Sequence, residues 1–403
     1  LKSQERFKTM SKLQASVTVV INSIAQSKKA AGIRVYNLSA GEPKLVTPKI
    51  VRDAAIKFIE IGDIPYPITA GQPELRKAAV ERMNELYNTN YTAEECIITT
   101  GGKFGLYLML QYLLGSSSPL KKDPTEKISV IIPAPYWVSY PAITKIMDGK
   151  PVVINTTEEG GWKLTPEMLK AAYTPDCKIL LINNGVNPTG IIYTRPEMKA
   201  LMDTANELGL LVISDEVYSG LVYTDDEYVS CGSFLEYKEN IVILQSASKT
   251  FAMTGWRVGF MLARKDLIDA LSALTTQSTT GVSLVCQHGA IGAFKHADEI
   301  TNWVNASMKK RRDVFVEAFK EHFGIELPLP KATLFVWTSL ASLWVKNMTD
   351  DEFCIRALEE ANVATVPGSG FGQPGYVRFS FAADEEDLIG GVASLAKFAK
   401  SLN

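Results

Sequence analysis

Residues 178–215 read KILLINNGVNPTGIIYTRPEMKALMDTANELGLLVISD, and they contain two short apolar runs separated by an amphipathic segment. The runs at 178–183 and 210–215 have the length of β-strands. Residues 195–208 between them have a proline in the first turn and then place apolar side chains at helical spacing. A strand, a helix and a second strand in this order are typical of an α/β domain.

The same alternation continues on both sides of this stretch. Residues 104–114 form another amphipathic segment, in which Leu106, Met109 and Leu113 fall on one stripe. Short apolar runs that alternate with helical segments predict a sheet covered by helices on both faces. The expected strands are 95–100, 128–132, 151–154, 178–183, 210–215, 241–246 and 259–263.

The sequence changes character near residue 295. A long charged helical pattern reaches Lys320, and a turn containing Pro328 and Pro330 follows it. This part of the chain predicts a separate, smaller α+β lobe, and the residues alone do not decide on which lobe positions 1–45 pack. The remaining elements expected in the lobe are the apolar runs 333–337 and 376–381 and a helix at 350–361.

Composition excludes several classes of protein. The chain has 403 residues, 46% of them hydrophobic, and its net charge of −2 provides no basic field for a nucleic acid. Its apolar runs are far shorter than the roughly 18 residues that cross a bilayer. The five cysteines show no C-x-x-C spacing, and the three histidines have no metal-ligand spacing. We therefore expect no metal, no membrane segment, no disulfide framework, and a cytoplasmic location.

Polar residues follow four of the expected strands. They are Gly101-Gly102-Lys103, the Asn-Pro-Thr-Gly segment 187–190, Asp215, and the Ser-Ala-Ser-Lys segment 246–249. Open α/β sheets bind ligands beyond the carboxyl ends of their strands. The sequence therefore predicts a ligand site where these four segments meet.

Lys249 is the only charged residue between Asn240 and Trp256. A lysine in a desolvated place loses part of its preference for the ammonium form, which makes it an amine nucleophile toward an aldehyde. The alternative is a lysine at a strand end whose ammonium group reaches water. Arg257, Ser246 and Ser248 favour the first interpretation, because a guanidinium and two hydroxyls suit a phosphate group.

The segment 246–260, SASKTFAMTGWRVGF, resembles the S-x-S-K-x-x-x-x-x-G-x-R-x-G signature of class I pyridoxal-phosphate aminotransferases. The resemblance extends from about residue 38 to 381. It implies fold type I, with a mostly parallel seven-stranded sheet in a large α/β domain and a smaller α+β domain. The implied division is 46–294 for the large domain, and 1–45 together with 295–403 for the small one.

The resemblance assigns roles around pyridoxal 5′-phosphate. Lys249 resembles the lysine that bonds to the cofactor and moves the substrate proton, and Asp215 the carboxylate that keeps the pyridine nitrogen protonated. Tyr218 and Asn187 resemble the donors to the phenolic oxygen of the cofactor. Trp137 resembles the aromatic residue that stacks on the ring, although by itself it is equally well a core residue.

Further residues match the positions that hold phosphate and substrate. Gly102 and Lys103, expected just before the helix 104–114, resemble phosphate-binding backbone groups at a helix N-terminus. Ser246 and Arg257 resemble the remaining phosphate ligands. Tyr66 resembles the tyrosine that reaches the phosphate of the neighbouring subunit, which implies a homodimer.

The substrate side is matched by Arg378, in GYVRFSFA, which resembles the arginine that clamps the α-carboxylate. Gly41, in LSAGEP, resembles a glycine close to the same carboxylate, and Trp137 and Asn187 also belong to this set. Ser16 and Thr18 resemble polar contacts farther along the substrate.

The resemblance favours an enzyme that exchanges amino groups by a ping-pong mechanism, with aspartate and 2-oxoglutarate as the leading pair. Lys103 follows the Gly-Gly pair as in subgroup Iγ, and an ammonium group there favours a second carboxylate. Segment 274–284 contains no basic residue that could take this role. Two alternatives stay open: a prephenate or aromatic aminotransferase, and a lyase that uses the same cofactor. Lys44, where relatives usually have aspartate, either adds positive charge at the entrance or is solvated.

Overall fold

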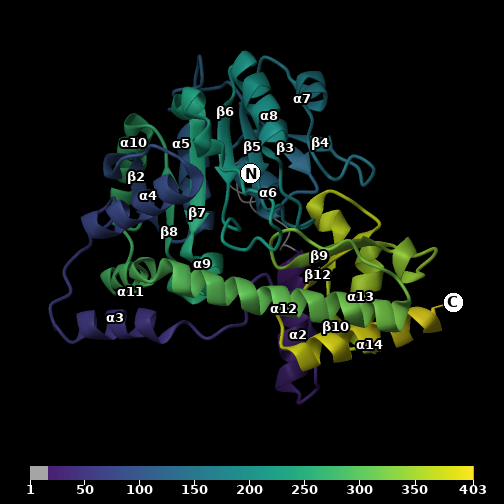
Figure 1. The fold of residues 1–403 in the computed structure, drawn as a ribbon. Helices are drawn as coiled ribbons and strands as arrows, with labels where there is room; N and C mark the ends of the chain where they lie inside the picture. The colour runs from purple at the N-terminus through teal and green to yellow at the C-terminus, as the bar shows by residue number, and fades with distance from the viewer. Residues whose placement is uncertain (1–16, 403) are drawn as a thin grey trace, which may run out of the picture.

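The computed structural model describes residues 17–402, and its centre is a seven-stranded sheet (Figure 1). The strand β8 runs antiparallel to its neighbours β2 and β7, and the other neighbouring pairs are parallel. The predicted α/β class and the mostly parallel sheet are thereby confirmed. In spatial order the strands are β2 (Cys96–Thr99), β8 (Gly259–Leu262), β7 (Ile241–Ser246), β6 (Leu211–Asp215), β5 (Cys177–Asn183), β3 (Ser129–Ala134) and β4 (Lys150–Asn155).

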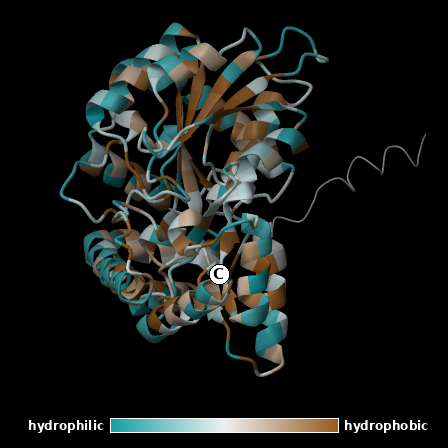
Figure 2. Ribbon diagram, turned by 90° about the vertical axis from the view of Figure 1, so that its right-hand side faces the viewer, coloured by the Kyte–Doolittle hydropathy of each residue, from teal (hydrophilic) through white to brown (hydrophobic). Residues whose placement is uncertain are grey.

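Each face of this sheet belongs to a different apolar cluster. On β5, Ile179 and Leu181 pack with one cluster, whereas Leu180 and Ile182 pack with the other. Strands covered on both faces are apolar at every position, which is why they were readable as continuous apolar runs. Figure 2 shows the same arrangement, with hydrophobic strands inside and hydrophilic residues on the outer helices.

The helices that cover the sheet follow the sequence pattern closely. Helix α8 has Pro196 in its first turn, and Thr194 and Glu197 form a reciprocal capping box at its start. The helices between the N-terminal segment and residue 295 are α3 (Lys49–Ile59), α4 (Pro73–Tyr87), α5 (Gly102–Leu114), α6 (Ser139–Ile146), α7 (Pro166–Ala172), α8 (Arg195–Glu207), α9 (Ala247–Thr250), α10 (Lys265–Thr276) and α11 (Leu284–Lys295).

The start of α5 differs from the prediction. The helix begins at Gly102, so Gly102 and Lys103 lie inside its first turn rather than before it. The residue before it, Gly101, has φ +77°, a conformation that glycine adopts without strain. A side chain at Gly101 would also collide with the guanidinium of Arg257. Two glycines read as a loop in the sequence, which is why the expected start at Phe104 was wrong.

The second lobe contains the three-stranded antiparallel sheet β11 (Val366–Pro367), β12 (Tyr376–Ser380) and β9 (Phe335–Ser339). It is joined to the large sheet by the long helix α12 (Ala297–Phe323), and Phe315 and Phe319 of that helix pack against Phe379 of β12 (Figure 1). The other helices of the lobe are α13 (Asp350–Glu360) and α14 (Glu385–Ser401).

The described N-terminal residues lie against this second lobe. After α2 (Val17–Ala30), the short strand β1 (Tyr36–Asn37) pairs in parallel with β10 (Val363–Ala364). The amide of Ser380 then donates to the carbonyl of Leu38 at 2.7 Å. This pairing brings the chain immediately before Gly41 to the edge of the large sheet where β6 and β7 end.

Within the described part of the chain, no helix combines the length and the apolar character that a bilayer crossing requires.

Candidate active site

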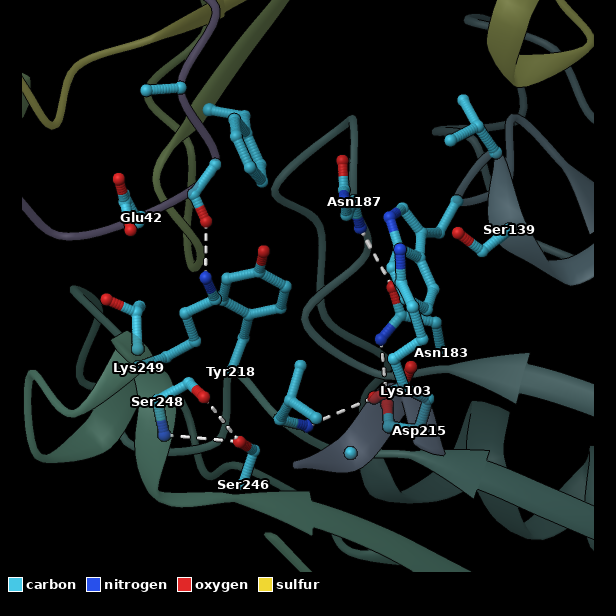
Figure 3. Close-up of a pocket in the computed structure, with 18 of the residues that line it drawn as sticks. Glu42, Lys103, Ser139, Asn183, Asn187, Asp215, Tyr218, Ser246, Ser248 and Lys249 are labelled. Atoms are coloured by element: carbon cyan, nitrogen blue, oxygen red, sulfur yellow. Dashed lines mark hydrogen bonds between the residues drawn. The ribbon is translucent and has the colours of Figure 1, made fainter. Parts of the chain in front are cut away.

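A cavity of about 730 Å³ opens at the carboxyl ends of the parallel strands. Residues from the large sheet, the N-terminal segment and the second lobe line it together (Figure 3). Tyr66 lies outside this cavity, and Ser16 and the side chain of Thr18 lie outside the described part of the structure. The other expected site residues line the cavity: Gly41, Gly102, Lys103, Trp137, Asn187, Asp215, Tyr218, Ser246, Lys249, Arg257 and Arg378.

Lys249 lies on α9, the single helical turn that follows β7. Its Nζ donates a hydrogen bond to the carbonyl of Gly41, and the side chain is only partly exposed. Burial lowers the pKa of Lys249 to about 8; Glu42 opposes this shift, and Arg378 and Arg257 add to it. An amine with this pKa has a far larger neutral fraction near neutral pH than a solvated lysine.

Asp215 ends β6 and is 4% exposed. Its Oδ2 accepts a hydrogen bond from the hydroxyl of Tyr140 at 2.7 Å, and its Oδ1 accepts one from the amide of Val217 at 3.3 Å. Burial raises the pKa of Asp215 to about 6, and these two hydrogen bonds limit the rise. The carboxyl group is therefore mostly ionised at neutral pH, without a cation bonded to it among the described residues.

Asn183 connects Asp215 to Asn187. Its side-chain amide donates to the carbonyl of Asp215 at 2.7 Å, and its oxygen accepts from the amide of Asn187 at 2.9 Å. Neither Asn183 nor Tyr140 was expected from the sequence. Asn183 ends β5, so the strand-end argument could have found it, whereas Tyr140, three residues after Trp137, carries no such signal.

Arg378 lies on β12 and is 4% exposed. Its Nη1 donates to Oδ1 of Asn187 at 3.0 Å and its Nη2 to the carbonyl of Ser39 at 2.9 Å, while the guanidinium lies 4.1 Å from the ring centroid of Phe335. Burial lowers the pKa of Arg378 to about 10. All these partners are uncharged, and the buried Nε finds no partner in the described structure. A buried guanidinium with only neutral partners suits a carboxylate ligand.

The first turn of α5 and the segment after β7 form an anion cradle. Gly102 and Lys103, in the first turn of α5, line the cavity, and the N–H groups and dipole at a helix N-terminus favour negative charge. The hydroxyl of Ser246 donates to the hydroxyl of Ser248 at 2.8 Å, and both serines line the cavity together with Arg257. A methyl group on Gly259 would lie 2.7 Å from the amide nitrogen of Gly102, so only glycine permits this close approach.

Lys103 points across the cavity to Trp137, with its Nζ 4.8 Å from the centre of the ring. Burial, and secondly the charge of Arg257, lower the pKa of Lys103. Trp137 in turn meets the ring of Tyr140 edge-on at 5.5 Å. The indole thus contacts both the ammonium group of Lys103 and the ring of Tyr140, whose hydroxyl donates to Asp215.

Tyr218 packs edge-on against Phe335 at 5.9 Å, and burial raises the pKa of its hydroxyl, which stays protonated as a donor. Tyr66 is the exception among the expected residues, because its side chain is 88% exposed and lies outside the cavity. Ser16 lies outside the described residues, and so does the side chain of Thr18. In the part of the chain that the structure describes, no group of three histidine, cysteine or acidic side chains could hold a metal ion.

The comparisons with known proteins agree with this geometry. A family model described as aminotransferase class I and II matches residues 33–394. The chain therefore belongs to this aminotransferase family, and it is a transaminase that depends on pyridoxal 5′-phosphate.

Individual relatives match over almost the whole length. An aspartate aminotransferase of Geobacillus stearothermophilus is 35% identical over 98% of both chains. A probable aspartate/prephenate aminotransferase of Aquifex aeolicus is 32% identical over 96% of this chain and 97% of that relative. The solved structure of the Thermus thermophilus aspartate aminotransferase with maleate has a TM-score of 0.89 at 31% identity, covering 97% of this chain and 98% of that one.

The residues present fit pyridoxal 5′-phosphate. The anion cradle suits its phosphate, Asp215 suits its ring nitrogen, and the neutral fraction of Lys249 suits its aldehyde. When bound, this cofactor supplies a carbonyl carbon that joins an amine and a ring that accepts negative charge from the neighbouring carbon.

We predict that the rate at which the apoprotein captures pyridoxal 5′-phosphate rises with pH up to about 8 and then levels. The neutral amine is the nucleophile, and its fraction saturates above the lowered pKa of Lys249. Stopped-flow absorbance measures this rate, and borohydride reduction of the Lys249→Ala variant is the control that shows which lysine reacts. A rate that still climbs tenfold per pH unit above pH 9 contradicts the assignment, because a solvated lysine behaves in that way.

Replacement of Tyr140 by phenylalanine removes the hydroxyl that stabilises ionised Asp215. The pKa of Asp215 then rises above about 6, and we expect an approximately tenfold loss of cofactor affinity at pH 7 that grows as the pH falls. Fluorescence titration of the apoprotein measures this affinity. Tyr136→Phe is the matched control, since Tyr136 lies just before α6, the helix that contains Tyr140, and does not contact Asp215; equal losses in both variants would refute the role of Tyr140.

Proposed function

We propose that this enzyme, a member of subgroup Iγ, transfers an amino group between aspartate and 2-oxoglutarate by a ping-pong mechanism. The observation that supports this most strongly is the placing of two cations, Arg378 and Lys103, in the cavity that contains Lys249. No acidic side chain pairs with either cation among the described residues. Two such positions suit the two carboxylates of a dicarboxylic amino acid.

In the proposed reaction, Arg378 binds the α-carboxylate and thereby fixes the α-carbon near Lys249. Lys249 Nζ removes the α-proton, a role that its lowered pKa favours.

Asp215 holds the proton on the ring nitrogen of the cofactor, and Tyr218 and Asn187 donate to its phenolic oxygen. Gly102, Lys103, Ser246 and Arg257 hold its phosphate. Trp137 covers the ring, and its indole also keeps water from that face.

The substrate contacts of Lys103 distinguish this proposal from a general amino-acid specificity. We expect Lys103→Ala to raise the KM for aspartate about tenfold or more and the KM for a neutral amino acid by much less, because only aspartate loses a charge-assisted contact. Steady-state kinetics with 2-oxoglutarate as acceptor measure both values. Lys122→Ala, in an exposed loop, is the control. Equal increases for both donors would show that Lys103 serves only the cofactor phosphate or the fold.

Two other substrate assignments are outcomes of the same assays. Prephenate is also a dicarboxylate, so the same two cations suit its carboxylates, and the Aquifex aeolicus relative is named for both substrates. An enzyme that releases ammonia without coupled formation of a new amino acid is a lyase. A panel of amino donors and oxo acids, with ammonia measured in parallel, separates these reactions.

We also propose a homodimer. The segment that contains α3 and the following loop exposes large apolar side chains, among them Val46 at 75%, Ile61 at 67% and Tyr66 at 88%. In Figure 1 this segment extends away from the large sheet. So many exposed apolar residues along one segment indicate an interface with a partner, and a second copy of the chain would bring Tyr66 to the cradle of its neighbour.

A hybrid dimer tests the position of Tyr66. A Lys249→Ala chain paired with a Tyr66→Phe chain contains one site with both native residues if Tyr66 acts across the interface. We expect this hybrid to bind cofactor at that site with native affinity, whereas the Tyr66→Phe homodimer binds it about tenfold more weakly. If Tyr66 serves its own subunit, the hybrid shows only the weak affinity.

We further propose that the chain forms two domains and that the protein is cytoplasmic. The pairing of β1 with β10 supports the grouping of residues 1–45 with 295–403, and leaves 46–294 as the large domain. All five cysteines are free, which supports a reducing compartment such as the cytoplasm.

A further inference from the structure

One wall of the cavity differs in charge from the others. Two acidic residues line the cavity, Asp215 at its base and Glu42 on this wall. The other charged residues that line the cavity are the cations Lys103, Lys249, Arg257 and Arg378. Figure 3 shows the carboxylate of Glu42 on the same side as Nζ of Lys249. The neighbouring carbonyl of Gly41 accepts the hydrogen bond of that Nζ. Gly41 and Glu42 therefore form a wall of hydrogen-bond acceptors.

Glu42 is bonded to no cation among the described residues, although its charge acts on Lys249. It forms no hydrogen bond or ion pair with another described residue, and its side chain is exposed at the mouth of the cavity. Lys44, two residues later, turns toward the second lobe instead, where its Nζ lies 3.0 Å from Asp384 and 3.7 Å from Asp387. Lys44 does not line the cavity, so the carboxylate of Glu42 remains available to a ligand.

The segment that contains Glu42 is held in place from both lobes. Nη1 and Nη2 of Arg311 on α12 donate to the carbonyl of Lys44 at 3.3 and 3.4 Å. Thr47 donates to the carbonyl of Ala252 at 3.1 Å and accepts from the indole of Trp256 at 3.0 Å. These contacts fix the backbone a few residues after Glu42 and so keep this part of the chain at the wall of the cavity.

We propose that Glu42, together with the carbonyl of Gly41, binds the ammonium group of the amino donor and so makes the site distinguish amino acids from 2-oxo acids. An ammonium group has three donors and no acceptor, which matches this wall. The nitrogen that is transferred must arrive beside Nζ of Lys249, where the wall lies. This inference rests on the proposed transfer of an amino group.

The two substrates of the ping-pong reaction differ in the charge that Glu42 recognises. The amino acid carries a positive charge that the oxo acid lacks, whereas both carry carboxylates that Glu42 repels. Glu42→Gln should therefore raise the KM for the amino donor and leave that for the oxo acid unchanged or lower. Because the site is exposed, we expect a change of about threefold to fivefold in the ratio of the two KM values.

Binding without turnover provides a second measurement. An α-methyl amino acid has the ammonium group but no α-proton, and succinate has two carboxylates but no amine. Absorbance titration of the holoenzyme should show about threefold to fivefold weaker binding of the first to Glu42→Gln, and equal or tighter binding of the second. The difference should shrink in high salt, because exposed charges are screened.

Two further variants complete the test. Glu42→Asp keeps the charge and should retain much of the discrimination, and Glu321→Gln removes an exposed carboxylate on α12, outside the cavity, and should change neither constant. An unchanged ratio in Glu42→Gln, or an equal change for both substrates, overturns the assignment. Failure of the proposed function is a separate result, since the unmodified enzyme would then show no exchange between any amino acid and oxo acid.

Discussion

The site depends on a lysine amine held where water solvates it poorly. Lys249 follows β7, and Asp215 ends the adjacent strand β6, so the register of these two strands fixes the distance between amine and carboxylate. Burial acts on both groups in opposite senses, lowering the pKa of Lys249 to about 8 and raising that of Asp215 to about 6. The same desolvation therefore brings the pKa of each group closer to neutral pH, where the group can both take up and release a proton.

The remaining charges divide the cavity into regions of opposite character. Arg378, Lys103 and Arg257 provide places for anions, while Gly41 and Glu42 provide acceptors beside Lys249. An amino acid has both kinds of group, so a cavity with this division orients it before any chemistry occurs. The large sheet supplies only part of it, because Arg378 comes from β12 and Gly41 from the chain after β1. The arrangement therefore requires both lobes to be packed together.

The sequence predicted the strands well because buried parallel strands are apolar along their whole length. The expected runs 178–183 and 241–246 correspond closely to β5 (Cys177–Asn183) and β7 (Ile241–Ser246). The residues that follow the expected strands also predicted where the cavity lies, since Asp215 and Lys249 both line it. The start of α5 was wrong, because the pair Gly101-Gly102 has the composition of a loop, although its second member belongs to the helix.

Other features depend on contacts between distant parts of the chain and have no local signal. Tyr140 meets Asp215, 75 residues away, and nothing in its neighbourhood marks its hydroxyl as a partner. The direction of Lys44 was open in the sequence and is determined by Asp384 on the second lobe. The resemblance to known aminotransferases predicted which residues hold the cofactor. The division of the cavity into regions of opposite charge is visible only in the three-dimensional structure.

A crystal structure of the enzyme with pyridoxal 5′-phosphate tests the central claim most directly. We predict continuous electron density from Nζ of Lys249 to the cofactor, the phosphate at the start of α5 beside Ser246 and Arg257, and the carboxylate of Asp215 facing the ring nitrogen. Density that joins the cofactor to another lysine, or a ring nitrogen facing away from Asp215, would contradict the account.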